Sequence, residues 1–323
     1  MLIIITEGSP ELGAGHLRRS ATLAATLADR APVRLWVLET DAAQMSISEV
    51  QDWFSGLSWE HGAAPRFHAG EVAILDLEPA SHRRMWELCA QNGVPCLALD
   101  YFDPARLPDL TINLLDHSGA MRAACAAAGI PGSYHEGPGY ALIRPSIRAR
   151  RTPPAASAIV RRVLVSMGGA DPRGRTLEAA NLLARHTGAQ VTVVLGPLVS
   201  GALETQVRAA APANFSVVRN PASFEELLAE ADVVLTSGGT TLLEALCLGK
   251  PVIAFPQNDG ETAHAAQFVE KGACAWADSL PRVFEDAGLR RSMAEKAARE
   301  LDGRGVERVA AVALELCKRR HSP

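Results

Sequence analysis

The sequence lacks the features that identify membrane-spanning and nucleic-acid-binding proteins. Aromatic residues make up only 5% of its 323 positions. No apolar run approaches the roughly 20 residues that span a bilayer. No block of like charges occurs, and 32 basic against 36 acidic side chains give a formal net charge of −4, which argues against an electrostatic footprint for nucleic acid or an anionic membrane. We therefore expect no nucleic-acid partner and no membrane anchor, so any anionic ligand has to be small and held locally.

The cysteines and the first residues exclude further classes. The six cysteines are scattered, without a C-x-x-C pair or a histidine cluster of metal-finger spacing, so we expect no metal site, no cofactor and a reducing, cytoplasmic location. The opening MLIII is followed at once by polar and turn-forming residues and lacks the basic segment and length of a signal peptide. No repeat of fixed period occurs, which excludes a solenoid.

What is present is an alternation of short aliphatic runs with Ala/Leu-rich segments of helical period, the pattern of a parallel α/β fold. The expected strands are 2–6, 33–38, 72–75, 97–99 and 110–113 in the first half, and 163–167, 191–195, 215–218, 233–236 and 252–255 in the second. A polar, proline-paired stretch, RARRTPPAAS at 148–157, is typical of an exposed linker. The sequence thus predicts two similar α/β domains, 1–150 and 151–323.

The first strand is followed by a glycine loop, Gly13-Ala14-Gly15, which leads into a helix at about 16–28. It resembles a dinucleotide fingerprint, but Arg18 stands where the third glycine is needed. The loop places His16 in the first helical turn, where the positive end of the helix dipole is expected to keep the imidazole neutral and usable as a general base. A residue that only caps or packs at the helix start is an equally good interpretation.

A second loop, from Ser166 to Thr176, nearly matches the phosphate-binding loop of nucleoside triphosphatases. Arg175 replaces the lysine of that motif, and Asp171 would put a carboxylate into the phosphate cradle. We therefore prefer a Gly168-Gly169 turn that lines a cleft between domains.

The third loop runs from strand 233–236 through Ser237, Gly238, Gly239, Thr240 and Thr241 into a helix that ends at Gly249 and Pro251. Free amides and hydroxyls at a helix start suit a pyrophosphate. Glu244, one turn later, can accept from the two hydroxyls of a ribose. Thr241-x-x-Glu244 is also a capping box, and helix rules alone favour that alternative. Arg144, in the segment 137–145, either meets a phosphate or is solvated.

Taken in order, these segments resemble the UDP-sugar hydrolases of pseudaminic acid biosynthesis (the PseG type; UDP-2,4-diacetamido-2,4,6-trideoxy-beta-L-altropyranose hydrolases). The segments are SPELGAGHLRRSATLAATLA, GPGYALIRP, SMGGADPRG, SGGTTLLEALCLGKP and LDGRGVERV. They span the chain in the order and at roughly the spacing of that family.

The resemblance implies a GT-B architecture, with two Rossmann-like domains that face each other across a cleft and a last helix against the first domain. It implies hydrolysis of a UDP-activated amino sugar with inversion, for flagellin glycosylation or another surface polysaccharide. We expect the UDP-sugar to be the small-molecule partner and the protein to be a monomer. His16 would be the base, the 238–241 loop would hold the pyrophosphate and Glu244 the ribose. The implied substrate-binding residues are Gly13, Gly15, Arg18, Arg144, Gly168, Gly169, Gly238, Gly239, Thr240, Thr241 and Glu244.

The chain departs from that family at positions expected to meet the sugar. It has Asp76-Leu77-Glu78 where the family has Asp-x-Tyr, Asp100-Tyr101 where it has paired aspartates, and Gln257-Asn258-Asp259 where it has Asn-Gln. Two alternatives therefore stay open, a GT-B glycosyltransferase with an acceptor in place of water and a sugar-nucleotide binding protein without catalysis. The first usually needs a membrane-docking patch, for which the sequence offers only Trp53-Phe54 and Arg83-Arg84.

Overall fold

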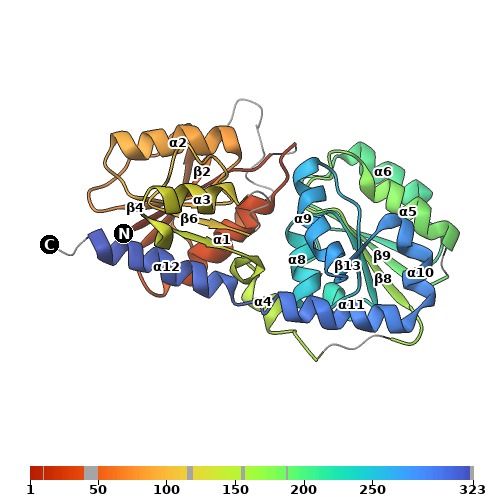
Figure 1. The fold of residues 1–323 in the computed structure, drawn as a ribbon. Coiled ribbons are helices and arrows are strands. Elements are labelled where there is room, and N and C mark those ends of the chain that lie inside the picture. The colour runs from red at the N-terminus through yellow and green to blue at the C-terminus, as the bar shows by residue number, and fades with distance from the viewer. Residues whose placement is uncertain (10, 40–49, 115–118, 154–156, 187, 321–323) are drawn as a thin grey trace. The chain divides into compact units, whose positions relative to one another are not determined.

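The computed structural model describes residues 1–9, 11–39, 50–114, 119–153, 157–186 and 188–320. They form two compact units, coloured along the chain in Figure 1. Unit 1 comprises Met1–Gly8, His16–Leu142 and Arg304–Pro323, and unit 2 comprises Ser9–Gly15 and Ile143–Gly303. The chain thus passes from unit 1 to unit 2 a few residues before the stretch 148–157 that we expected to be the linker, of which 154–156 lie outside the described residues.

Unit 1 is built on a parallel sheet with the strand order β3-β2-β1-β4-β5-β6-β7. Its strands are β1 (Leu2–Thr6), β2 (Val33–Leu38), β3 (Trp59–Gly62), β4 (Val72–Asp76), β5 (Cys96–Leu99), β6 (Leu110–Asn113) and β7 (Tyr134–Glu136). The five predicted strands of this half are confirmed to within a residue at each end. The edge strands β3 and β7 were not predicted, because WEHG and YHE contain no aliphatic run.

Helices cover both faces of this sheet, which is why every residue of β1 is buried. They are α1 (Gly15–Ala28), α2 (Pro79–Gln91), α3 (Ala120–Ala127) and α12 (Gly305–Arg320), with short 3-10 helices η2 (Gln51–Phe54), η3 (Pro131–Ser133) and η4 (Pro138–Tyr140). Figure 1 shows α2 on one face and α12 on the other. Ile3 and Ile5 of β1 pack with Met85 and Cys89 of α2 in one buried cluster.

The apolar pair Trp53-Phe54 does not form an exposed patch. Phe54 is 1% exposed and lies 5.3 Å from the Trp59 ring, centroid to centroid. The guanidinium of Arg18 covers the Trp53 ring at 4.6 Å. Trp53 and Phe54 therefore do not form the membrane-docking patch for which the sequence made them candidates.

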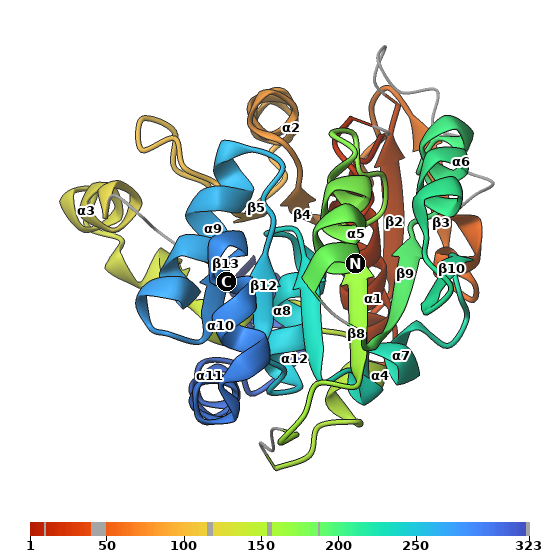
Figure 2. The ribbon, with the colours of Figure 1, turned by 90° about the vertical axis from the view of Figure 1, so that its right-hand side faces the viewer.

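Unit 2 is also built on a parallel sheet, with the strand order β10-β9-β8-β11-β12-β13. Figure 2 shows this sheet and the helices around it. The strands are β8 (Arg162–Ser166), β9 (Gln190–Leu195), β10 (Phe215–Arg219), β11 (Val233–Thr236), β12 (Val252–Ala254) and β13 (Cys274–Trp276). The helices are α4 (Pro145–Arg148), α5 (Arg175–His186), α6 (Gly201–Ala210), α7 (Phe224–Glu230), α8 (Thr240–Cys247), α9 (Asp259–Glu270), α10 (Leu280–Glu285) and α11 (Ala287–Glu300), with the 3-10 helix η5 (Ala277–Ser279).

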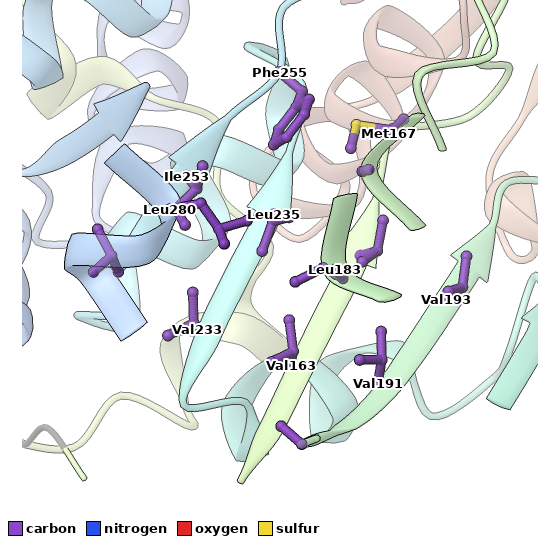
Figure 3. Packing of buried hydrophobic residues seen from close by; sticks show 14 of the residues in the cluster. Val163, Met167, Leu183, Val191, Val193, Val233, Leu235, Ile253, Phe255 and Leu280 are labelled. Carbon is purple, nitrogen blue, oxygen red and sulfur yellow. The ribbon is translucent and has the colours of Figure 1, made fainter. Parts of the chain in front are cut away.

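The core of unit 2 explains why its strands read as almost continuous aliphatic runs. Figure 3 shows Val191 of β9, Val163 of β8 and Val233 of β11, which the strand register places side by side. Leu183 of α5 and Leu280 of α10 belong to the same buried cluster. Both units are therefore open parallel sheets with helices on both faces, and the predicted fold of two Rossmann-like domains is confirmed.

Candidate functional site

In unit 1, acidic side chains gather at the carboxyl ends of three neighbouring strands. β4 pairs with β1 and with β5, and the register sets Asp76 opposite Thr6 and Leu99. Glu7, Asp76, Glu78 and Asp100 therefore lie at one edge of the sheet, the edge at which parallel α/β folds bind ligands.

Helix α1 presents His16 and Arg19, one turn apart, to this acidic edge. His16 Nδ1 donates to Asp76 Oδ1 at 2.7 Å. Arg19 Nε donates to Asp76 at 3.0 Å and Arg19 Nη1 donates to Asp100 Oδ2 at 2.7 Å. Ser20 is the third side chain that donates to Asp76, with its Oγ at 2.8 Å. The Asp76 carboxylate is fully buried and satisfied from several directions, so it fixes both cations of α1.

Asp100 reaches this network through a strained backbone. Its φ is 52°, in the left-handed region that residues other than glycine rarely adopt. In that conformation Asp100 Oδ1 accepts from the amide of Leu114 at 2.9 Å while Oδ2 faces Arg19. Non-glycine residues held this way cluster at functional sites.

The charge of His16 differs from the prediction. Burial on its own would lower the pKa of the imidazole, but the Asp76 carboxylate beside Nδ1 outweighs both burial and the neighbouring Arg19, and the pKa rises to about 9. The expectation that the helix dipole keeps the ring neutral is therefore wrong for this arrangement. A helix terminus contributes a partial charge, whereas Asp76 contributes a full charge at hydrogen-bond distance.

Glu78 completes the group from the other side of the ring. It is the N-cap residue of α2, and its Oε1 lies 3.3 Å from His16 Nε2. Its side chain is 42% exposed, whereas that of His16 is 18% exposed. A hydrogen bond from His16 holds the pKa of Glu78 below its usual value. Glu78 is thus the most exposed carboxylate of this cluster.

Sequence reasoning named only His16 among these residues as a site residue. Asp76, Glu78 and Asp100 were noted as departures from a motif, and Arg19 was not singled out. The signal that could have found them is positional: each acidic residue follows the end of a predicted strand, and Arg19 is one helical turn beyond His16, on the same helix face.

In unit 2 the loop between β11 and α8 has the predicted position but a different cap. The N-cap of α8 is Gly239, and no side chain caps the helix. The capping box of Thr241 and Glu244 is therefore not formed. The predicted end of the helix is confirmed: Gly249 follows the C-cap with a φ of 66°, and the Lys250 amide bonds back to Ala245.

The carboxylate of Glu261, from α9, lies in this loop. It accepts from the amide of Gln257 at 2.8 Å, and it is hydrogen-bonded to the amide of Gly238 and to the Ser237 side chain. Burial raises the pKa of Glu261 in spite of these bonds. The loop therefore already holds an anionic group by the kind of donors we predicted for a phosphate.

Gly238 is required here by close approach of two backbones. A Cβ at this position would lie 2.2 Å from the carbonyl oxygen of Glu261. We expect Gly238→Ala to destabilise unit 2 by about 1–3 kcal/mol, the cost of overpacking a tight site. The matched control is Gly201→Ala in the first turn of α6, where an added Cβ meets nothing within 4 Å. Chemical denaturation of both variants checks this, and equal stabilities would contradict it.

The Gly168-Gly169 turn is held by packing within unit 2. A Cβ on Gly196 would lie 2.3 Å from the Gly168 carbonyl oxygen, and the Gly169 carbonyl accepts from the amide of Leu198 at 2.9 Å. Asp171 fills the start of α5, since its carboxylate accepts from the amides of Arg175 and Thr176, both at 2.8 Å. Those amides are the ones that a nucleotide phosphate would need, so the interpretation against a triphosphatase loop is supported.

Arg144 and Glu244 are brought together as a buried ion pair. Arg144 Nε donates to Glu244 Oε1 at 2.6 Å and Nη2 donates to Oε2 at 2.9 Å. Arg144 also donates to Glu225 at 2.6 Å, and its guanidinium lies over the Phe224 ring. Arg144 is thus not solvated. Glu244 is 2% exposed, with each oxygen already accepting one hydrogen bond.

The remaining predicted residues lie in or beside these loops. Gly13, with a φ of 84°, closes a turn by two backbone hydrogen bonds with Ser9. Gly15 opens α1, and Thr240 and Thr241 are the first residues of α8. Across the ranges that the structure describes, no group of three or more His, Cys, Asp or Glu residues is arranged to hold a metal ion. The helices in those ranges are all too short or too polar to span a bilayer.

Two Rossmann-like domains in one chain are the components of the GT-B class of fold, and comparison with known proteins agrees with that class. Residues 169–279 match the model of the glycosyltransferase family 28 C-terminal domain. The chain is 25% identical to the spore coat polysaccharide biosynthesis protein SpsG of Bacillus subtilis (strain 168), with 97% of each chain covered.

Solved structures with the same fold include proteins whose sequence identity to this chain is low. The S. aureus MnaA–UDP co-structure matches with a TM-score of 0.66 and 13% identity, over 98% of this chain and 96% of that chain. MurG of Acinetobacter baumannii matches with a TM-score of 0.61 and 12% identity, over 97% of this chain and 99% of that chain. At such identities the likeness establishes the fold alone.

Proposed function

We propose that the protein hydrolyses a UDP-activated diacetamido-trideoxy sugar at its anomeric C–O bond, in the biosynthesis of a pseudaminic-type nonulosonic acid or another surface polysaccharide. The observation that carries this proposal is the His16 cluster, in which Asp76 fixes the imidazole and Glu78 presents a carboxylate to solvent. The match of residues 169–279 to a glycosyltransferase family 28 domain, and the similarity to a polysaccharide biosynthesis protein, support the substrate class.

We assign the nucleotide to unit 2. The start of α8 offers the positive end of a helix dipole beside Gly238, Gly239, Thr240 and Thr241. The Glu261 carboxylate in this loop supports the idea that its donors accept an anion. A protein of the same fold has been solved with UDP. The pyrophosphate would accept hydrogen bonds from these donors, either in place of the Glu261 carboxylate or together with it. The Gly168-Gly169 turn follows β8, the strand that pairs with β11.

We assign the chemistry to unit 1. The oxygen of a water molecule forms a bond to the anomeric carbon on the face opposite UDP, and the C–O bond to the β-phosphate breaks with its electron pair on UDP. The configuration at the anomeric carbon inverts. The proton of the water passes to the cluster at His16, the residue that the family resemblance implies as the base.

A glycosyltransferase is the second candidate, favoured by the family 28 match. The same cluster would then take the proton from an acceptor hydroxyl instead of water. The burial of Phe54 and the cover that Arg18 gives Trp53 remove one membrane-docking feature that such an enzyme would use. The experiment that separates hydrolysis, transfer and binding without catalysis is a screen of UDP-, CMP-, GDP- and CDP-sugars without acceptor, with the products followed by NMR.

A ribose-specific binding experiment tests Glu244. Glu244→Leu alone should destabilise unit 2 by about 3–5 kcal/mol, because it leaves Arg144 buried beside fewer carboxylates. The double variant Arg144→Met/Glu244→Leu removes both charges and should recover most of that stability.

If Glu244 holds the ribose, wild-type protein binds UDP at least about tenfold more tightly than 2′-deoxy-UDP, a difference of about 1.4 kcal/mol, and the double variant loses this preference. A preference that survives in the double variant leaves Glu244 with a structural role only.

A further inference from the structure

Both ring nitrogens of His16 face carboxylate oxygens. Nδ1 is 2.7 Å from Asp76 Oδ1 and Nε2 is 3.3 Å from Glu78 Oε1. An ionised carboxylate only accepts hydrogen bonds, so each nitrogen has to carry a proton to make its contact. His16 is then an imidazolium and has no lone pair with which to take a proton from a nucleophile.

We propose that Glu78, rather than His16, is the catalytic base that takes the proton from the attacking water. This inference rests on the proposed hydrolase function. His16 becomes a positioning residue whose Nε2–H orients the Glu78 carboxylate, and Asp76 holds His16 in place from Nδ1. A carboxylate that activates water directly is chemically sufficient, because inverting glycosidases use one for this step.

The exposure of the three side chains supports this assignment. The Asp76 side chain is fully buried and that of His16 is 18% exposed, whereas that of Glu78 is 42% exposed. Of the two carboxylates that contact His16, Glu78 is therefore the one that offers a free surface to a water molecule. Its oxygen lone pairs other than the one facing His16 remain available.

The backbone of Glu78 is anchored from a neighbouring strand. The carboxylate of Glu7, which follows β1, accepts from the Glu78 amide at 2.6 Å and from Ser81 Oγ at 2.7 Å. Glu7 is 1% exposed, so it acts as a buried support for the first turn of α2. A base fixed at both its backbone and its side chain is preorganised for proton transfer.

The step balances without a further reactant. The water oxygen bonds to the anomeric carbon, the bond from that carbon to the phosphate oxygen breaks, and UDP leaves with the electron pair. One water proton moves to Glu78, which becomes a neutral carboxylic acid and later returns the proton to solvent. The other proton stays on the free sugar as its anomeric hydroxyl.

The two possible bases predict opposite pH profiles. The titratable and charged groups that face the Glu78–His16 pair are Glu7 after β1, Arg19 of α1, Asp76 at the end of β4, His82 of α2 and Asp100 after β5. If Glu78 is the base, activity needs an ionised Glu78 and a charged His16, so it persists into mildly acidic solution and falls as the pH rises through about 9. If His16 is the base, activity instead rises through that pH.

Variants of Glu78 and the nucleophile azide test the proposal directly. Glu78→Ala should lower kcat for hydrolysis by at least about a hundredfold, the usual scale for a lost general base. Azide needs no deprotonation, so adding it to Glu78→Ala should restore UDP release and yield the inverted glycosyl azide. The matched control is Glu87→Gln, an exposed residue on the same helix, which should keep the wild-type kcat. UDP binding to each variant checks that the chain is folded.

The outcomes separate two proposals, that Glu78 is the base and that the protein hydrolyses a UDP-sugar. Wild-type kcat in Glu78→Ala, or a loss that azide does not rescue in a variant that still binds UDP, overturns the role of Glu78 and leaves hydrolysis in place. Activity that increases through pH 9 in wild-type protein overturns it as well. Failure of the wild-type protein to release UDP from any UDP-sugar overturns the proposed function, and the role of Glu78 falls with it.

Discussion

Asp76→Asn is expected to destabilise unit 1 by about 3–5 kcal/mol, the usual cost of breaking a buried ion pair from one side. The side chain of Asp76 is fully buried and accepts hydrogen bonds from His16, Arg19 and Ser20. An asparagine keeps the volume but leaves Arg19 with Asp100 as its one remaining carboxylate among these contacts. Tryptophan fluorescence during urea denaturation measures the effect, because Trp36, Trp53, Trp59 and Trp86 all belong to unit 1.

The control is Asp52→Asn, an exposed aspartate in the same unit, which should change the stability by less than about 0.5 kcal/mol. The pH dependence gives a second readout. Because the folded pKa of His16 lies near 9, above its ordinary value of 6.5, its stabilising contribution is complete below pH 6.5 and is lost as the pH rises through 9. Asp76→Asn should flatten that decline. A loss of less than 1 kcal/mol would contradict the role of Asp76 as the fixed centre of the cluster.

His16→Asn is expected to lower kcat for UDP-sugar hydrolysis by at least about a hundredfold, whether His16 is the base or the group that orients the base. Asparagine can still donate to one carboxylate, but it cannot contact both Asp76 and Glu78 and carries no positive charge. The affinity for UDP should stay unchanged, because the proposed nucleotide site lies in unit 2. Steady-state kinetics and UDP titration measure the two quantities.

His68→Asn serves as its control, since His68 is exposed in the same unit and lies outside the cluster described above. It should behave as wild type in both measurements. Unchanged turnover in His16→Asn would remove His16 from the mechanism, both as the base and as the residue that orients the base.

The fold could be predicted from the sequence because the buried strands leave a strong local signal. β1 and β11, covered on both faces, read as LIIIT and VVLT. The strands β3, β7 and β13 lie at the ends of their sheets and have one partner strand each. Such edge strands need no continuous aliphatic run, so the composition of WEHG, YHE and CAW did not reveal them.

The candidate site was predicted only in part, because its contacts join residues far apart in the chain. His16 was recognisable from a local pattern, a glycine loop that opens a helix. Its charge depends on Asp76, 60 residues away, and no local rule contains that contact. The capping box of Glu244 failed for the same reason: Arg144, 100 residues earlier, takes the carboxylate that helix rules assign to the helix start.

The proposed hydrolysis is tested by NMR of purified protein with a UDP-linked 2,4-diacetamido-2,4,6-trideoxy sugar and no acceptor. We expect UDP and free sugar to accumulate together, the first-formed sugar to have the anomeric configuration opposite to the substrate, and His16→Asn to suppress both products. Absence of UDP release from every nucleotide sugar in the screen, or release only after an acceptor hydroxyl is added, would contradict it.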